Sequence, residues 1–228
     1  MTPARLLTCL LSLVVAVPVL PAQTAHKSDA PAAHTAHTRR ETAHSKEAAI
    51  LPSYSAYNDH PKLAIILVID QFRGDYLDRW RADFKNKGFD LFLDHGAYFP
   101  DCYYDYANTK TAPGHATIGT GAYTDGHGIA SNEWWDLSRN QDRPVSSVED
   151  EHYRLVGLPN AAKPVTGSSP RNLLASTVGD ELRLATQGQA KVFGVSLKDR
   201  AAILSAGAAA NGAFWIDRVS GAFVTSSF

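Results

Sequence analysis

The sequence has few cysteines, no excess of either charge, and no apolar run long enough for a membrane-spanning helix. Two cysteines cannot build a disulfide framework, so the fold has to rest on a packed core. The 22 basic and 23 acidic residues give a net charge of −1, which argues against a nucleic-acid-binding protein or a polybasic membrane-surface protein. The hydrophobic fraction of 44% is too high for a chain that is disordered throughout.

Residues 1–22 have the pattern of a secretory signal peptide. Arg5 lies in a start without acidic residues, and the apolar stretch Leu6–Leu20 that follows is shorter than the roughly 20 apolar residues of a spanning helix. Small residues at Pro21-Ala22 mark the expected cleavage site. A buried helix is the alternative, but polar sequence follows directly. We expect export to the periplasm or the medium, with no stable membrane anchor after cleavage.

Residues 23–60 are rich in Ala, Thr, Ser and His and have almost no large aliphatic side chains. Such a segment cannot bury enough apolar surface to offset its ordering entropy, which predicts a disordered linker. Its histidines could bind a transition metal, but they have no fixed ligand spacing. The length of 228 residues alone allows one domain or a small pair. We expect the folded body at residues 61–228.

From Lys62 onward, strand patterns alternate with helix patterns, which is typical of an α/β layered fold. The apolar runs Leu63–Ile69 and Val192–Leu197 predict strands that are covered on both faces, as in a parallel sheet. Further expected elements are helices at Phe89–Leu93 and Thr109–Gly121, a helix from Ser169-Pro170 to Gly188, an aromatic strand at Ala97–Tyr106, and a hairpin of Phe214–Ile216 and Ala222–Thr225.

Charged residues follow both buried strands, at the edge where ligands collect in such sheets. Asp70 follows the first strand, and Lys198 and Arg200 follow the second. A carboxylate and two cations at one edge indicate a site for a metal ion and an anion. On position alone, a helix cap at Asp70 and a solvated charge cluster at Lys198-Asp199-Arg200 are equally good explanations.

Thr111 directly precedes Ala112-Pro113-Gly114, so we expect its hydroxyl at a helix N-terminus. Unsatisfied backbone N–H groups and the helix dipole favour an oxyanion or a phosphate there. A threonine hydroxyl is a poor nucleophile unless a bound metal stabilises its alkoxide. An ordinary threonine cap is the alternative.

Four patterns in this order resemble the alkaline phosphatase superfamily, in the branch of type I phosphodiesterases, nucleotide pyrophosphatases and phosphate-irrepressible alkaline phosphatases. They are the strand ending in Asp in VIDQFRGDYL, the segment TKTAPGH at 109–115, Thr120-Gly121, and HGIASN at 127–132. The resemblance extends from about Lys62 to the last residue. It implies a three-layer α/β sandwich with a mostly parallel central sheet, incomplete in this chain.

The resemblance also implies roles for single residues. Asp70 would be a zinc ligand. Thr111 would bind the metal and act as the nucleophile that becomes transiently phosphorylated, with Thr109 the competing hydroxyl. Asn132 would donate a hydrogen bond to a non-bridging phosphoryl oxygen, although turn chemistry alone could also explain an asparagine there.

The segment GVSLKDR at 194–200 resembles the phosphate-irrepressible monoesterases, which place a lysine and an arginine against the transferred phosphoryl group. A monoester dianion carries one more negative charge than a diester, so the two cations Lys198 and Arg200 favour it. The sequence therefore predicts a phosphomonoesterase acting on small-molecule phosphate esters through a phosphothreonine. A type I phosphodiesterase is the alternative.

The predicted metal site is incomplete. Two zinc ions in the complete enzyme need three or more protein ligands each. His115 and His127 match positions that the family uses for packing and hydrogen bonding, and the one histidine after Asn132 is His152, in an acidic loop. We expect an N-terminal fragment or a truncated product with little activity. A non-catalytic exported anion-binding module is a further alternative, and no feature indicates an oligomeric state.

Overall fold

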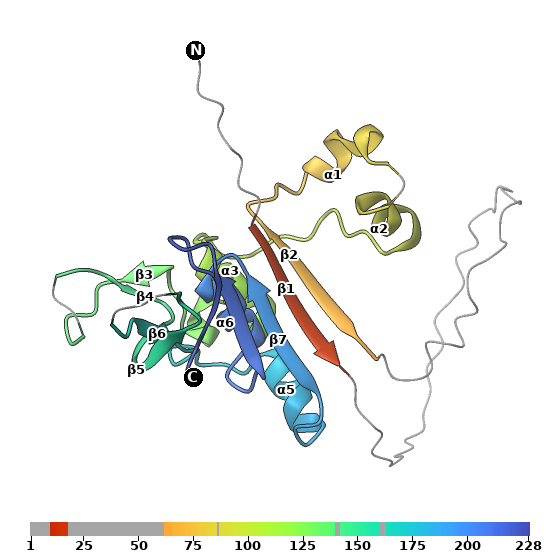
Figure 1. Ribbon diagram of the computed structural model, residues 1–228. Coiled ribbons are helices and arrows are strands. Elements are labelled where there is room, and N and C mark those ends of the chain that lie inside the picture. Colours follow the sequence, from red (N-terminus) through yellow and green to blue (C-terminus); the bar gives the residue numbers. More distant parts are fainter. Residues whose placement is uncertain (1–9, 18–61, 86, 140–141, 160–162) are drawn as a thin grey trace, which may run out of the picture.

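The computed structural model describes residues 10–17, 62–85, 87–139, 142–159 and 163–228. Figure 1 shows a twisted sheet with helices packed against it. The strand order is β2-β1-β7-β8-β9-β5-β6. These strands are β1 (Leu10–Val17), β2 (Ala64–Asp70), β5 (Glu149–Val156), β6 (Thr166–Ser168), β7 (Lys191–Ser196), β8 (Gly212–Ile216) and β9 (Phe223–Ser226), and a separate pair consists of β3 (Glu133–Trp134) and β4 (Val145–Ser146).

The sheet is mixed. Strand β1 is antiparallel to both β2 and β7, and β7 is parallel to β8, so β2, β7 and β8 run in the same direction. This agrees with the two parallel strands that the apolar runs predict. The pairs β8–β9, β9–β5 and β5–β6 are antiparallel. The α/β class is confirmed, with β8 and β9 forming the predicted hairpin.

Strand β1 comes from the segment that the sequence predicts to be a signal peptide. It pairs with β2 from Leu10 opposite Asp70 to Ala16 opposite Ala64, and with β7 from Leu13 opposite Val195 onward. Cleavage after residue 22 stays a prediction. The predicted linker at 23–60 lies outside the described residues.

The helices are α1 (Tyr76–Arg79), the short 3₁₀ turn η2 (Arg81–Asp83), α2 (Phe89–His95), α3 (Thr111–Thr120), α4 (Thr124–His127), α5 (Val178–Ala185) and α6 (Asp199–Ala206). Helix α6 packs against β7 and β8, and α3 packs against α6. The buried core lies between these layers and includes Ala112, Ala116, Leu204 and Trp215. None of the described helices has the length and apolar character needed to cross a membrane.

Two glycines allow the close approach of these layers. A Cβ atom at Gly194 of β7 would lie 2.2 Å from the carbonyl oxygen of Ala202 in α6. At Gly119 of α3, a Cβ atom would lie 2.8 Å from the carbonyl oxygen of Leu204. Because both contacts are to backbone of α6, the position of this helix depends on having no side chain at either glycine.

Helix α3 agrees with the predicted helix to within two residues at each end, and its C-cap Gly121 is left-handed with φ of 70°. Helix α5, however, begins at Val178 and not at Ser169-Pro170. Thr177 and Asp180 form a capping box: the Asp180 N–H donates to Thr177 Oγ1 at 3.1 Å, and the Thr177 N–H donates to Asp180 Oδ2 at 2.8 Å. This reciprocal cap starts the helix later than proline and periodicity indicate.

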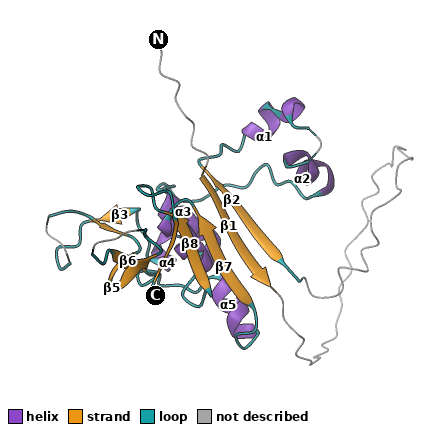
Figure 2. Ribbon diagram, viewed as in Figure 1, coloured by secondary structure: helices purple, strands orange, loops and turns teal. Residues whose placement is uncertain are grey.

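Three further expectations are wrong. Residues 97–110 contain no strand (Figure 2), because aromatic side chains such as Phe99 and Tyr103, 74% and 80% exposed, do not pack on the sheet. Strand β2 is not covered on both faces, since Ile65 and Leu67, and Leu63 just before the strand, are about half exposed. His152 lies within strand β5 rather than in a loop.

Candidate active site

Thr111 is the first residue of helix α3 and lies against the end of strand β2. Its Oγ1 donates a hydrogen bond of 2.9 Å to Oδ2 of Asp70, the last residue of β2. Thr111 is buried, whereas Thr109 is exposed. Because the carboxyl end of the edge strand β2 meets a helix N-terminus here, the hydroxyl lies at the positive end of the dipole of α3, which favours an anion.

Asn132, in the loop that follows α4, also contacts the N-terminus of α3, next to Thr111. The backbone N–H of Ala112 donates to its Oδ1 at 2.8 Å, which fixes the orientation of the side-chain amide. The Nδ2 group forms no hydrogen bond with any of the described residues and keeps its donors for a ligand. The loop is also tied to the chain before α3, because Lys110 Nζ donates to Ser131 Oγ at 3.2 Å and Asn108 Nδ2 donates to the Ala130 carbonyl.

Lys198 and Arg200 lie at the N-terminus of helix α6, directly after strand β7. Burial lowers the pKa of Lys198, as does the charge of Arg200, while Asp70 acts in the opposite direction. Lys198 therefore lies within electrostatic range of Asp70 without forming an ion pair to it. Arg200, Lys198 and Asp70 all act on the buried ring of His115. Asp70 contacts Thr111, and Asn132 contacts Ala112, at the N-terminus of α3, and the two cations lie within electrostatic range of this helix at His115.

Two buried histidines hold helix α3 in place. His115 Nδ1 donates to the Thr111 carbonyl oxygen at 2.8 Å. His127 Nδ1 accepts from the Ile129 N–H at 3.0 Å, so its Nε2 carries the proton that it donates to Thr117 Oγ1 at 3.1 Å. Burial lowers the pKa of both rings. Packing and hydrogen bonding thus account for both histidines, as expected.

Residues 64–224 match the family model for type I phosphodiesterase / nucleotide pyrophosphatase. The chain belongs to this phosphodiesterase family. Alkaline phosphatase PafA of Elizabethkingia meningoseptica is 44% identical over 168 residues, which cover 74% of this chain and 30% of PafA. Alkaline phosphatase PhoV of Synechococcus elongatus is 41% identical over 186 residues, which cover 81% of this chain and 33% of PhoV.

Solved structures of PafA have the same fold as this member of the phosphodiesterase family. A crystal structure of a PafA variant, in which a threonine, an asparagine, a lysine and an arginine are substituted, matches with a TM-score of 0.64 and 41% identity. The match covers 70% of this chain and 30% of that chain. The chain spans about a third of the length of the curated relatives it matches. By family, it is related to phosphate ester hydrolases.

The ligand atoms near Thr111 are too few for a complete zinc site of a phosphodiesterase-family enzyme. Asp70 and Thr111 offer one carboxylate and one hydroxyl 2.9 Å apart, whereas catalytic zinc usually has three protein ligands. Within the described part of the chain, three possible metal-ligand atoms lie within 4.8 Å of one another at Asp150, Glu151 and His152 of strand β5. The residues around Thr111 therefore fit a metal only in part.

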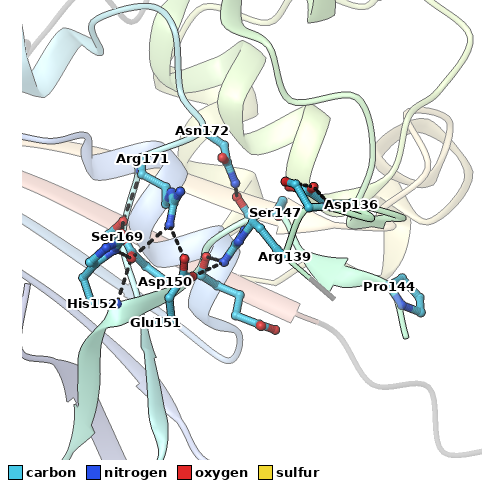
Figure 3. A network of polar contacts seen from close by, with 12 residues as sticks. Asp136, Arg139, Pro144, Ser147, Asp150, Glu151, His152, Ser169, Arg171 and Asn172 are labelled. Atoms are coloured by element: carbon cyan, nitrogen blue, oxygen red, sulfur yellow. Dashed lines mark hydrogen bonds and ion pairs between the residues drawn. The ribbon is translucent and has the colours of Figure 1, made fainter. Parts of the chain in front are cut away.

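Two arginines already neutralise the acidic residues of this β5 group (Figure 3). Arg171 contacts Asp150 at 3.2 Å and Glu151 at 3.1 Å, and Arg139 contacts Glu151 at 2.5 Å. Burial raises the pKa of Asp150, but hydrogen bonds from Ser169 and His152 outweigh it and lower the pKa to about 2. The network holds the chain around Ser169 against β5. Sequence reasoning missed it, because the arginines join β5 from positions 12 and 20 residues away.

Proposed function

We propose that this chain is the nucleophile-bearing segment of a phosphomonoesterase that hydrolyses small phosphate esters through a phosphothreonine at Thr111. The observation that carries the proposal is the hydrogen bond of 2.9 Å between Thr111 Oγ1 and Asp70 Oδ2 at the first turn of α3. A hydroxyl and a carboxylate meet there at the positive end of the dipole of α3, beside the side-chain amide of Asn132. These groups are suited to bind a phosphate ester and attack its phosphorus atom.

In this proposal, Thr111 loses its hydroxyl proton to solvent, its Oγ1 attacks the phosphorus atom, and the bond from phosphorus to the ester oxygen breaks. The departing alkoxide takes a proton from solvent. Water then attacks the phosphothreonine, releases inorganic phosphate and restores the hydroxyl. Asn132 Nδ2 donates to a non-bridging oxygen, since its Oδ1 is occupied by the Ala112 N–H. Preorganised donors of this kind supply most of the acceleration in such reactions.

Lys198 and Arg200 support a monoester rather than a diester as the substrate. Both cations lie within electrostatic range of His115, which contacts Thr111. A monoester dianion gains more from two such cations than a diester monoanion does. The substituted residues of the PafA variant are of the same four types as Thr111, Asn132, Lys198 and Arg200. The threonine and asparagine are the same number of positions apart in both proteins, and so are the lysine and arginine.

Asp70 and Thr111 are the metal ligands that this chain contributes in the proposal, which assigns two zinc ions to the complete enzyme. Zinc bound to Thr111 would stabilise its alkoxide. Because Asp70 and Thr111 offer only two ligand atoms among the described residues near Thr111, the proposal requires further ligands from elsewhere in the complete protein. We expect little hydrolysis of p-nitrophenyl phosphate by the isolated chain, even with added zinc. Substantial turnover in that assay would contradict this expectation.

The nucleophile is tested in the complete protein with Thr111→Ala and Thr111→Ser variants. We expect Thr111→Ala to abolish hydrolysis of both p-nitrophenyl phosphate and its bis-ester, and Thr111→Ser to keep part of it because a hydroxyl remains. Mass spectrometry after an acid quench should find the phosphoryl group on the peptide that contains Thr111. Full activity of Thr111→Ala would refute the proposed nucleophile.

The matched family includes phosphodiesterases, which keeps a diesterase as the second candidate function. Lys198→Ala separates the two candidates: a loss confined to the monoester supports the phosphomonoesterase, and an equal loss for both substrates supports the diesterase. If the wild-type protein binds phosphate but never forms a phosphothreonine, it is an anion-binding module. The pattern of residues 1–22 supports an exported protein in each case.

A further inference from the structure

A cavity of about 240 Å³ lies beside the candidate active site, at the ends of strands β7 and β8. Lys198, Asp199 and Arg200 line it from the start of α6, and Trp215, Asp217 and Arg218 line it from the end of β8. Its volume is below the roughly 300–1,000 Å³ of sites for drug-sized ligands. The cavity therefore suits a compact group rather than a whole organic ligand.

The cavity has cations that lack partners. Lys198 Nζ and the Arg218 guanidinium form no hydrogen bond or ion pair with the part of the chain that the structure describes. Arg200 Nε is buried without a hydrogen-bond partner among the same residues. A cluster of three cations with unused donors is a favourable place for an oxyanion.

The two carboxylates of the cavity are occupied by local contacts. Asp217 Oδ2 accepts from the Ser220 N–H at 2.7 Å and from Ser220 Oγ at 2.6 Å. Asp199 Oδ1 accepts from the Arg200 N–H at 2.7 Å and lies 3.8 Å from the Arg200 guanidinium. Neither carboxylate neutralises Arg218, and Arg218 together with Arg200 acts on Lys198 to lower its pKa, after burial as the main cause.

We propose that Arg218 forms a second anion subsite together with Lys198 and Arg200, which binds the second phosphate group of a small substrate that carries two. The proposal rests on the proposed phosphatase function, because the group to be transferred has to lie at Thr111. Lys198 and Arg200 line the cavity. Both also lie within electrostatic range of His115, which contacts the Thr111 carbonyl oxygen, so in the proposal the same two cations face both phosphate groups. Arg218, which is exposed on the turn after β8, contacts only the second group. Substrates with two phosphates are thereby preferred to simple monoesters.

The test measures the binding of two non-hydrolysable probes to this chain by titration calorimetry at fixed ionic strength. The probes are propane-1,3-bisphosphonate and propylphosphonate, which share a carbon chain and differ in the second anion. We expect Arg218→Ala to weaken binding of the bisphosphonate about tenfold, which corresponds to about 1.4 kcal/mol. Binding of the monophosphonate should weaken no more than about threefold, because an exposed charge at a distance is screened. Arg218→Lys should restore part of the loss.

Lys191→Ala is the matched control, since it removes the same charge from the exposed start of β7, away from the cavity. It should change both affinities by less than about twofold. An Arg218→Ala variant that weakens both probes equally, or neither, overturns the subsite, and so does a wild-type chain that binds neither probe. Because binding is measured, the result is independent of whether Thr111 is the nucleophile, which the Thr111 variants decide.

Discussion

At the scale of single residues, the side-chain amide of Asn132 has two separate tasks. Its Oδ1 accepts from the Ala112 N–H at 2.8 Å, and its Nδ2 group keeps its donors for a ligand. The first task fixes the loop against helix α3, and the second contributes to binding of the phosphoryl group. A substitution that keeps one task and removes the other can therefore distinguish structure from catalysis.

Asn132→Asp keeps an acceptor for the Ala112 N–H and replaces the donor with a negatively charged oxygen. We expect kcat for p-nitrophenyl phosphate in the complete protein to fall about 10²–10³-fold, the usual cost of losing one preorganised donor. The thermal midpoint should change little, because the contact to Ala112 remains. Unchanged kcat in Asn132→Asp would show that the Nδ2 group does not contact the phosphoryl group.

The buried ring of His127 predicts a loss of stability in acid. Burial lowers its pKa below the ordinary value of 6.5, so the unfolded chain binds a proton at a higher pH than the folded chain does. The free energy of unfolding should then decrease as pH falls below about 6.5, by up to about 1.4 kcal/mol per pH unit for each such histidine. Urea denaturation between pH 7.5 and about 5 measures this slope.

His127→Gln should make that slope shallower, because glutamine keeps a donor for Thr117 and does not titrate. The exposed His95 at the end of α2 provides the control, and His95→Gln should leave the slope as in wild type. A wild-type slope that survives in His127→Gln would assign the acid sensitivity to another group, with His115 the next to be replaced.

The residues of the candidate site were predictable from sequence where the signal is local. Thr111 before Ala112-Pro113 and Asp70 after an apolar strand both follow from short-range patterns, and the structure has them in contact. Arg218 could not be found in this way. It lies on an exposed turn, and only the parallel pairing of β8 with β7 brings it to the cavity of Lys198.

At the scale of elements, the contact between α3 and α6 sets the distance from Thr111 to the two cations. Gly119 makes this contact possible, because a Cβ atom there would lie 2.8 Å from the Leu204 carbonyl oxygen. Thr111 and Gly119 belong to one helix, and Lys198 and Arg200 begin the other. A side chain at Gly119 would therefore push apart the two halves of the candidate site.

Gly119→Ala should lower the free energy of unfolding by about 1–3 kcal/mol, the usual cost of overpacking a core. Gly114→Ala is the matched control in the same helix, since a Cβ atom there would lie 3.8 Å from the nearest heavy atom, Tyr106 Oη. That change should be neutral or stabilising by about 0.4–1 kcal/mol, because alanine favours a helix. Equal effects of the two variants in urea denaturation would contradict the close packing.

Elements with a strong local pattern agreed with prediction, and those that depend on distant partners did not. The apolar runs of β2 and β7 were found, as was α3 with its proline near the start and its terminal glycine. Strand β5 was missed, because EDEHYRLV begins with charged residues whose partners, such as Arg171, lie far along the chain. The start of α5 was misplaced, since the Thr177 capping box overrides periodicity.

At the scale of the whole molecule, β1 joins two strands that are parallel to each other. Strands β2 and β7 both pair with Leu10–Val17 and not with one another. Removing β1 would leave unpaired N–H and C=O groups along both strands, which is a known cause of aggregation. The apolar side chains of Ile65 and Leu67 on β2 are already about half exposed, which would add to this tendency.

A chain that begins at residue 23 should therefore be less stable and more prone to associate than the chain 1–228. Hydrogen exchange tests this directly: amides of Ile65–Ile69 and Phe193–Val195 should lose protection when residues 1–22 are absent. Amides of α5, which packs against α3, α6 and β7, serve as the internal reference. Equal protection of β2 and β7 in both chains would show that β1 is dispensable for the sheet.

The position of Leu10–Val17 also sets an order of events for biogenesis. A segment that is passing through a translocation channel cannot at the same time form hydrogen bonds with β2 and β7 as a strand of the sheet. If residues 1–22 direct export, the nascent polypeptide has to reach the channel before Leu10–Val17 pairs with β2 and β7. Premature closure would trap the precursor in the compartment where it was synthesised.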